Sequence, residues 1–244
     1  MAERLDTALT ARGLCSSRNR AQTLISEGHV TVNGSICMKA AQKVTQADTI
    51  AVTEELPFVG RGGYKLRYAL AEFQIRLDGL RCLDVGASTG GFTDCMLQHG
   101  AAHVLAVDVG HDQLAQELRA DARVTVMEGT DLRTLAPDTE GLPADFASCD
   151  VSFISLRQII PHLPQLLTEN GTAVLLVKPQ FEAGRAALNK HGIVKDEKLR
   201  QQVLRDIMNC CAGYGLLPSG SCESPIKGGS GNTEYLLYVK RELP

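Results

Sequence analysis

A glycine-rich turn between a buried strand and a helix constrains this chain's fold more than any other feature. The stretch CLDVGASTGGFTDCML has the pattern of a strand, a turn and a helix, with glycines at 86, 90 and 91. From residue 64 onward, apolar strand patterns alternate with amphipathic helix patterns. Such alternation is typical of a parallel, doubly wound sheet with helices on both faces. We therefore predict an α/β domain with a Rossmann-like, mostly parallel sheet.

The same turn predicts a ligand site. In doubly wound sheets, ligands bind outside the carboxyl ends of the strands, first of all at this position. The glycines let the backbone approach a ligand, and the start of the following helix offers free N–H groups. Asp108 ends the next strand, in VLAVDVG. A carboxylate there can accept hydrogen bonds from a ribose diol.

The spacing of the turn favours one cofactor over another. A dinucleotide motif needs G-x-G-x-x-G, but Ser88 occupies its third position, and no lysine follows the glycines to make a P-loop. S-adenosylmethionine has no pyrophosphate and fits the D-x-G-x-x-x-G-G pattern. The alternative is a turn that only closes a strand–helix unit. The candidate cofactor-binding residues are Gly86, Ala87, Ser88, Thr89, Gly90, Gly91, Phe92 and Asp108.

The N-terminal residues predict a second, smaller domain. Two short helix patterns precede HVTVNGSICM, whose alternation around Asn33-Gly34 predicts a hairpin with a type I′ turn. KVTQADTIAV adds another strand. Glycines and a proline then punctuate ELPFVGRGGYKL. We predict a small α+β domain over 1–56, a linker over 57–63 and the large domain over 64–244.

Composition narrows the class of protein. No apolar run reaches membrane-spanning length, and the charged N-terminus predicts no export signal. Eight cysteines without a C-x-x-C pair indicate reduced, buried thiols, as in a cytoplasmic protein. The six histidines show no i, i+4 pair, so we expect no metal site. Zinc or disulfides remain the less favoured alternatives for the cysteines.

Charge is distributed unevenly along the chain. The formal net charge is −3, but residues 108–150 alone carry three Lys/Arg against ten Asp/Glu. Residues 1–50, 57–81 and 178–205 are each mildly basic. Because nucleic-acid binding depends on the local field, an RNA partner stays possible, with plain solvated surface as the alternative.

Several longer strings resemble one family. RLDTALTARGLCSSRNRAQTLISEGHVTVNG is similar to an S4 RNA-binding domain, and VGRGGYKL, LDVGASTGGFTD, AVDVG, CDVSFISL, VKPQFEAGR and NTEYLL are similar to an FtsJ-type methyltransferase. Together they resemble the TlyA family, also called hemolysin A. The resemblance implies methyl transfer from S-adenosylmethionine to a cytidine 2′-hydroxyl in ribosomal RNA of the small or large subunit, or both.

The resemblance also implies residue roles. The Lys-Asp-Lys-Glu tetrad of FtsJ-type enzymes falls on Lys65, Asp150, Lys178 and Glu234. Asp150 also joins the candidate cofactor-binding residues, and Asp131, in EGTDL, is a candidate acceptor for the adenine amino group. Lys178 ends the apolar strand VLLV. A rigid strand end places a catalytic group well, so we expect Lys178 to act as general base or to stabilise the reacting oxygen.

Basic residues outside the tetrad are candidates for phosphate contacts, which position RNA without reading its sequence. They are Arg4, Arg18, Arg20, Lys39, Arg61 and Arg185. Three other functions stay open: a non-catalytic RNA-binding ribosome assembly factor, a small-molecule methyltransferase, and a hemolysin. The absence of tryptophan and an aromatic content of 5% disfavour a membrane-active protein.

Overall fold

The structure, a computed structural model, describes residues 2–26, 28–53, 57–228 and 230–242. The chain divides into two compact units, residues 1–61 and 62–244. This division lies inside the linker that the sequence predicts over 57–63, while residues 54–56 lie outside the described residues. Gly62 and Gly63 belong to the first helix of the second unit and not to a linker.

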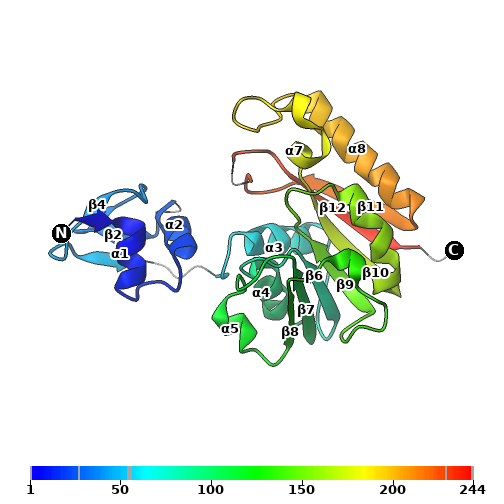
Figure 1. Cartoon of the computed structure of the whole chain (residues 1–244), viewed down its shortest axis with the longest axis horizontal. Helices are drawn as coiled ribbons and strands as arrows, with labels where there is room; N and C mark the ends of the chain where they lie inside the picture. Colours follow the sequence, from blue (N-terminus) through cyan, green and yellow to red (C-terminus); the bar gives the residue numbers. More distant parts are fainter. Residues whose placement is uncertain (1, 27, 54–56, 229, 243–244) are drawn as a thin grey trace. The chain divides into compact units, whose positions relative to one another are not determined.

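The N-terminal unit packs two helices against short antiparallel strands around an apolar core (Figure 1). At the predicted hairpin, Asn33 and Gly34 both have positive φ, 51° and 81°. This is the type I′ turn that Asn-Gly favours, so the hairpin prediction is confirmed. The elements are β1 (Glu3–Arg4), α1 (Leu5–Ala11), α2 (Arg18–Ser26), β2 (Val30–Val32), β3 (Ser35–Ile36), β4 (Lys43–Val44) and β5 (Ile50–Val52).

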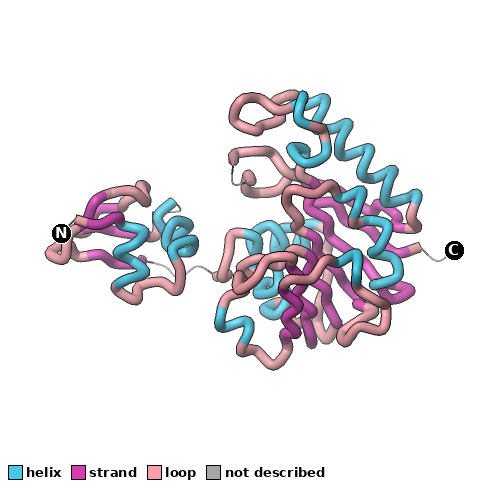
Figure 2. Tube along the Cα trace, viewed as in Figure 1, coloured by secondary structure: helices cyan, strands magenta, loops and turns pink. Residues whose placement is uncertain are grey.

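The second unit is built on a seven-stranded sheet with the order β11-β12-β10-β9-β6-β7-β8. Figure 2 shows these strands in magenta, with helices in cyan beside them. β12 runs antiparallel to both β10 and β11, and the other four strand pairs of the sheet are parallel. The predicted mostly parallel, doubly wound sheet is therefore confirmed. Its strands are β6 (Arg81–Val85), β7 (His103–Asp108), β8 (Val124–Glu128), β9 (Ala144–Cys149), β10 (Leu167–Val177), β11 (Leu216–Glu223) and β12 (Tyr235–Arg241).

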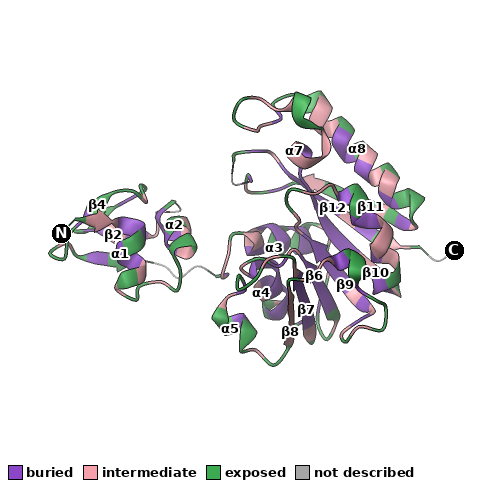
Figure 3. Cartoon of the chain, viewed as in Figure 1, coloured by how far each residue is buried: buried purple, intermediate pink, exposed green. Residues whose placement is uncertain are grey.

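Helices cover both faces of the sheet because successive side chains of a strand point to opposite faces. On β6, Leu83 and Val85 pack in a cluster that includes residues of α8 (Glu197–Gly213), whereas Asp84 faces α4 (Gly91–Gln98). The central strands are buried along most of their length (Figure 3). α3 (Gly62–Glu72) packs beside α4, and α5 (Gln116–Arg119) follows β7.

The segment LRQIIPHLPQLL differs from its prediction. Its apolar spacing predicts one helix, but the chain forms two 3-10 turns, η2 (Leu156–Gln158) and η3 (Ile160–His162), and a single helical turn, α6 (Leu163–Leu166). Pro161 and Pro164 each lack the N–H that a continuous helix requires. Strand β10 begins immediately afterwards, at Leu167, well before the predicted AVLLVK.

Asp84 is a fully buried carboxyl beneath the glycine turn. The Thr93 hydroxyl donates to it at 2.7 Å from α4, and the Ser148 hydroxyl donates at 2.9 Å from β9. Burial raises the pKa of Asp84 from 3.8 to about 6, although the two hydroxyl donors act in the opposite direction. This carboxyl therefore links three elements that meet at the turn.

The raised pKa predicts a pH dependence of stability. Below about pH 4 the carboxyl is protonated in both states; as pH rises towards 6 and above, the folded state must ionise it in a buried site. The free energy of unfolding should therefore fall over this window by up to about 3 kcal/mol. Urea denaturation at pH 4.5, 5.5 and 7 should show this fall in the natural chain, and Asp84→Asn should lack it. Glu169→Gln, which changes an exposed carboxylate, is the control and should show the same fall as the natural chain. An equal change of unfolding free energy with pH in all three proteins would contradict the assignment.

Candidate active site

The glycine turn is held against the end of β9 by backbone contacts. Asp150 N donates to Val85 O at 2.9 Å, so the chain after β9 runs alongside the start of the turn. Gly86 has a φ of 82°, and a Cβ there would lie 2.6 Å from the Asp150 carbonyl oxygen. Only glycine combines this backbone conformation with this close approach. The turn and Asp150 are therefore fixed to each other.

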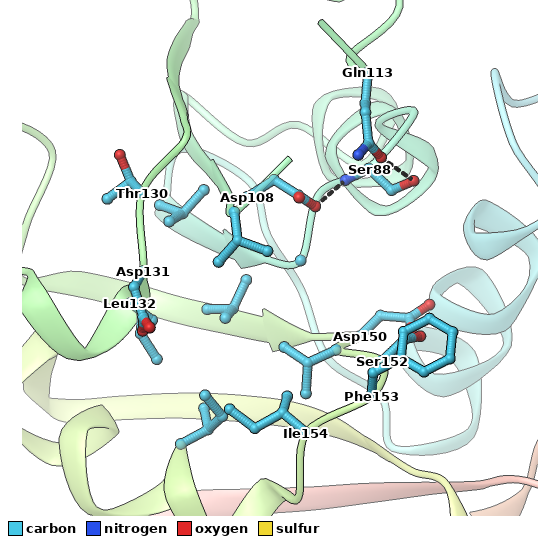
Figure 4. A pocket seen from close by; sticks show the side chains of 16 residues that line it. Ser88, Asp108, Gln113, Thr130, Asp131, Leu132, Asp150, Ser152, Phe153 and Ile154 are labelled. Atoms are coloured by element: carbon cyan, nitrogen blue, oxygen red, sulfur yellow. Dashed lines mark hydrogen bonds between the residues drawn. The ribbon is translucent and has the colours of Figure 1, made fainter. Parts of the chain in front are cut away.

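Asp108 closes the turn from the other side. Its carboxylate accepts Ser88 N at 2.8 Å (Figure 4). The same carboxylate accepts Gly110 N at 2.7 Å. Ser88 has a φ of 48°, which turns its amide towards this carboxylate. A carboxylate has about four lone-pair sites, so two backbone bonds leave capacity for a ligand hydroxyl. Asp108 therefore holds the turn and can still receive a ribose.

A cavity of about 390 Å³ lies at the carboxyl ends of β6, β7 and β9, within the usual size range of ligand sites. Apolar side chains make one part of its wall, and polar groups on the turn and the strand ends make the rest (Figure 4). The lining residues are Val85, Gly86, Ser88, Val107, Asp108, Val109, Gln113, Thr130, Asp131, Leu132, Asp150, Val151, Ser152, Phe153, Ile154 and Ile159.

A second cavity, of about 200 Å³, has a more polar lining. It shares Gly86, Ser88, Asp150 and Ser152 with the first cavity. The two cavities therefore adjoin around the glycine turn and the end of β9, which suits a ligand with one apolar and one charged part. The remaining lining residues of the second cavity are Gly62, Ala87, Thr89, Gly91, Phe92 and Lys178.

Lys178 lies in the second cavity at the end of β10, and only 8% of the residue is exposed. Its Nζ lies 2.5 Å from Asp150 Oδ1 and donates to Ser152 Oγ at 2.8 Å. The Lys178–Asp150 pair is close but poorly aligned, since Oδ1 accepts no hydrogen bond of regular geometry within the described part of the chain. Pro179 begins the helical turn α7 (Pro179–Glu182) and directs the chain away from the sheet. The ammonium group is thus held at the cavity wall.

Lys65 and Glu234 form a second buried ion pair. Lys65 Nζ, from α3, donates to Glu234 Oε2 at 2.7 Å, and the side chains are 10% and 3% exposed. Glu234 immediately precedes β12, whose Tyr235 pairs with Val177 of β10. Continuing this antiparallel register by one residue places Glu234 across from Lys178. Asp150, Lys178 and Glu234 therefore lie at the same end of the sheet, where β9 and β10 end and β12 begins, and Lys65 reaches this end from α3.

Comparisons with known proteins agree with this geometry. The family model described as FtsJ-like methyltransferase matches residues 58–241, and the S4 domain model matches residues 3–50. The chain is 42% identical over 241 residues to "16S/23S rRNA (cytidine-2'-O)-methyltransferase TlyA" of Mycobacterium tuberculosis, covering 98% of this chain and 90% of that protein. This chain belongs to the TlyA family of FtsJ-like methyltransferases.

Two further TlyA-family relatives carry a different name. "Hemolysin A" of Brachyspira hyodysenteriae is 41% identical, over 96% of this chain and 98% of that protein. A solved structure from Streptococcus thermophilus, described as a candidate hemolysin, is 42% identical with a TM-score of 0.79, over 99% of this chain and 89% of that one. Within the described part of this chain, no helix is long and apolar enough to cross a membrane.

The structure places the other predicted cofactor residues of this TlyA-family chain in different settings. Gly90 lines neither cavity, and a Cβ there would lie 2.8 Å from Leu114 Cδ1 and closer still to Leu118, so its missing side chain makes room for these leucines. Asp131 does line the first cavity, but its carboxylate accepts the Arg133 backbone amide at 2.9 Å and the guanidinium at 2.6 Å. The Arg133 hydrogen bonds lower the pKa of Asp131.

The predicted RNA contacts divide between the two units. In the N-terminal unit, the buried Asp6 carboxylate accepts Arg4 Nε at 2.9 Å and Arg18 Nε at 3.0 Å, which holds two of the predicted arginines together. Arg20 donates to Phe58 O at 3.3 Å. The three remaining candidates are exposed: Lys39 and Arg61 in the N-terminal unit and Arg185 in the methyltransferase unit.

Three residues with notable contacts at the cavities, Ser152, Gln113 and Phe153, are not among the residues predicted from the sequence. Ser152 receives the Lys178 ammonium, and Gln113 reaches the turn through the Ser88 hydroxyl at 3.2 Å. Phe153 is 93% exposed, has a φ of 63°, and lies 5.2 Å from the Phe181 ring. A positive φ is rare for a bulky residue, and backbone conformations of this kind cluster at functional sites. Sequence alone carries a signal only for Ser152 and Phe153, which fall inside CDVSFISL.

Proposed function

We propose that this TlyA-family chain transfers a methyl group from S-adenosylmethionine to the 2′-hydroxyl of a cytidine in ribosomal RNA. The observation that carries the proposal is the pair of buried Lys–carboxylate contacts at one end of the sheet, Lys178–Asp150 and Lys65–Glu234, beside two adjoining cavities. Charged residues are rarely buried unless they are paired, and pairs of buried charges that line a cavity are typical of functional sites. The substrate follows the printed name of the Mycobacterium tuberculosis relative.

The cavities fit the proposed cofactor. An adenosine can occupy the larger cavity, with its ribose towards Asp108, and the charged methionine part can occupy the polar cavity beside the turn. At Gly86, a side chain would close the approach between the turn and Asp150. When bound, S-adenosylmethionine supplies an electrophilic methyl group on a sulfonium. The chain's own residues must then orient the RNA hydroxyl and remove its proton.

Lys178 is the group placed for that task. Its Nζ lies in the wall of the polar cavity, fixed by the strand end, Asp150 and Ser152. As a general base, Lys178 takes the proton of the ribose hydroxyl on Nζ while the hydroxyl oxygen attacks the methyl carbon. Asp150 then stabilises the ammonium that results. Lys65 and Glu234 hold a second charge pair across from it and keep the local charge balanced.

The mouth of the site suits a nucleic acid. Phe153 and Phe181 offer an aromatic surface beside Lys178, whose Nζ lies 5.9 Å from the Phe181 ring centre. Exposed aromatic side chains stack on unpaired bases, and a ribose in folded RNA has to be turned out to reach such a pocket. An N-terminal unit matched by the S4 model would be superfluous for a small-molecule substrate.

The first test concerns the role of Lys178. Lys178→Ala should reduce methyl transfer to ribosomal subunits by a factor on the order of 10²–10⁴, because a general acid–base group contributes about that much. Lys178→Arg should not restore the rate, since a guanidinium cannot give up a proton. Single-turnover rates with saturating cofactor and RNA measure the chemical step.

Lys198→Ala, at an exposed position on α8, is the matched control and should keep the natural rate. Filter binding and calorimetry should show that all variants still bind RNA and cofactor. Near-normal turnover by Lys178→Arg would refute the base role and leave only electrostatic positioning of the hydroxyl.

The second test concerns RNA binding by the N-terminal unit. Each phosphate contact adds to the salt dependence of affinity, by roughly 0.7–0.9 in the slope of log affinity against log salt. The double change Arg18→Gln with Lys39→Gln should therefore flatten that slope by about 1 to 2. Cofactor affinity should not change. Arg76→Gln, at a side chain 86% exposed in the other unit, is the control, and an unchanged slope in the double variant would mean that these are plain surface charges.

A further inference from the structure

Residues 109–114, here called the cap segment, lie beside the glycine turn. Val109 and Gln113 line the larger cavity, and the Ser88 hydroxyl donates to Gln113 Oε1 at 3.2 Å (Figure 4). Leu114 fills space that a side chain at Gly90 would need. The cap segment therefore contacts the glycine turn and forms part of the wall of the larger cavity.

One carboxylate holds the cap segment. Glu128, at the end of β8, accepts three consecutive backbone amides: Asp112 N at 2.7 Å, Gln113 N at 2.9 Å and Leu114 N at 2.9 Å. The Arg119 guanidinium pairs with the same carboxylate, which is only 11% exposed. Burial would raise the pKa of Glu128, but Arg119 and the amides outweigh it and lower the pKa to about 2.

The backbone of the cap segment has an unusual conformation next to the Glu128 carboxylate. Asp112 has a φ of 53°, a left-handed conformation that is uncommon for residues other than glycine. Such a conformation persists where surrounding contacts determine it. At the base of the segment, Gly129 N donates to Gly110 O at 2.8 Å and extends the β7–β8 pairing. At the tip of the segment, the three consecutive amides go to the Glu128 carboxylate, and Arg119 Nε, paired with that carboxylate, donates to Leu114 O at 3.2 Å.

We propose that Glu128 is a positioning residue for the cofactor site. It lines neither cavity, and it acts by fixing the cap segment so that Val109 and Gln113 complete the wall of the larger cavity. This inference rests on the proposed function, because the ligand of that cavity is S-adenosylmethionine. It predicts that the charge of Glu128 controls cofactor affinity and leaves the chemical step unchanged.

Glutamine cannot replace this anchor. Glu128→Gln keeps the length of the side chain but puts an NH₂ group, itself a donor, among three amide donors and a guanidinium. At least one backbone amide then loses its partner, and the ion pair with Arg119 is lost. Glu117→Gln removes the same charge from an exposed position on α5, beyond the cap segment, and is the matched control.

The test measures affinity, turnover and local opening together. Glu128→Gln should weaken S-adenosylmethionine and S-adenosylhomocysteine binding by about tenfold or more by calorimetry, the effect of losing at least one hydrogen bond to a charged group. The KM for the cofactor should rise in parallel, with kcat within about twofold. In hydrogen exchange without ligand, peptides covering 109–115 should exchange faster, and peptides of β10 should not change. Glu117→Gln should match the natural chain in every measurement.

Three results would contradict a positioning role for Glu128. Unchanged affinity in Glu128→Gln, with the natural chain binding normally, overturns the inference. Faster exchange throughout the methyltransferase unit, with a lowered melting temperature, shows a general structural role and also overturns it. If the natural chain binds no S-adenosylmethionine, the proposed function fails and this inference fails with it. Exchange of the 109–115 peptides would then still report whether Glu128 holds the cap segment.

Discussion

The close backbone contact between the ends of β6 and β9 determines where every group of the site lies. Asp150 N bonds to Val85 O at 2.9 Å, and Gly86 leaves no room for a Cβ against the Asp150 carbonyl. The glycine turn and the chain that carries Asp150 and Ser152 consequently form one rigid edge. Because both cavities share residues of this edge, the contact fixes how the larger cavity lies relative to the smaller one, which Lys178 lines.

Charge pairing is the second constraint on the site. Burying an unpaired ammonium is costly, and the two lysines are tolerated because each has a carboxylate within hydrogen-bonding distance. Removing one partner of such a pair costs more than the pair contributes to stability. We therefore expect that losing any one member of the two pairs lowers the stability of the fold as well as disturbing the charges at the strand ends. Glu128 is a similar case, because its carboxylate accepts hydrogen bonds from three backbone amides and pairs with Arg119.

The sequence predicts the features that depend on local patterns. The parallel sheet, the Asn33-Gly34 hairpin and the strand that delivers Lys178 follow from spacing and turn chemistry, and the structure confirms them. The helix predicted over LRQIIPHLPQLL fails because periodicity ignores the two prolines that interrupt it.

Contacts between distant parts of the chain were beyond local reasoning. Lys65 and Glu234 are 169 residues apart, and only the family resemblance brings them together in advance. Gly90 belongs to a ligand motif by spacing, yet its missing side chain makes room for Leu114 and Leu118. Gln113 and Glu128 carry no sequence signal, because their roles arise only when the segment after β7 folds back on the turn.

Methyl transfer to ribosomal subunits tests the central claim most directly. The chain would be incubated with cofactor labelled in the methyl group and with small and large subunits from cells that lack this modification. The RNA would then be digested to nucleosides and separated by mass. The account predicts label in 2′-O-methylcytidine from at least one subunit, and incorporation slower by a factor on the order of 10²–10⁴ with Lys178→Ala. Label in a base-methylated nucleoside, or no label on either subunit from a chain that binds both cofactor and RNA, would contradict it.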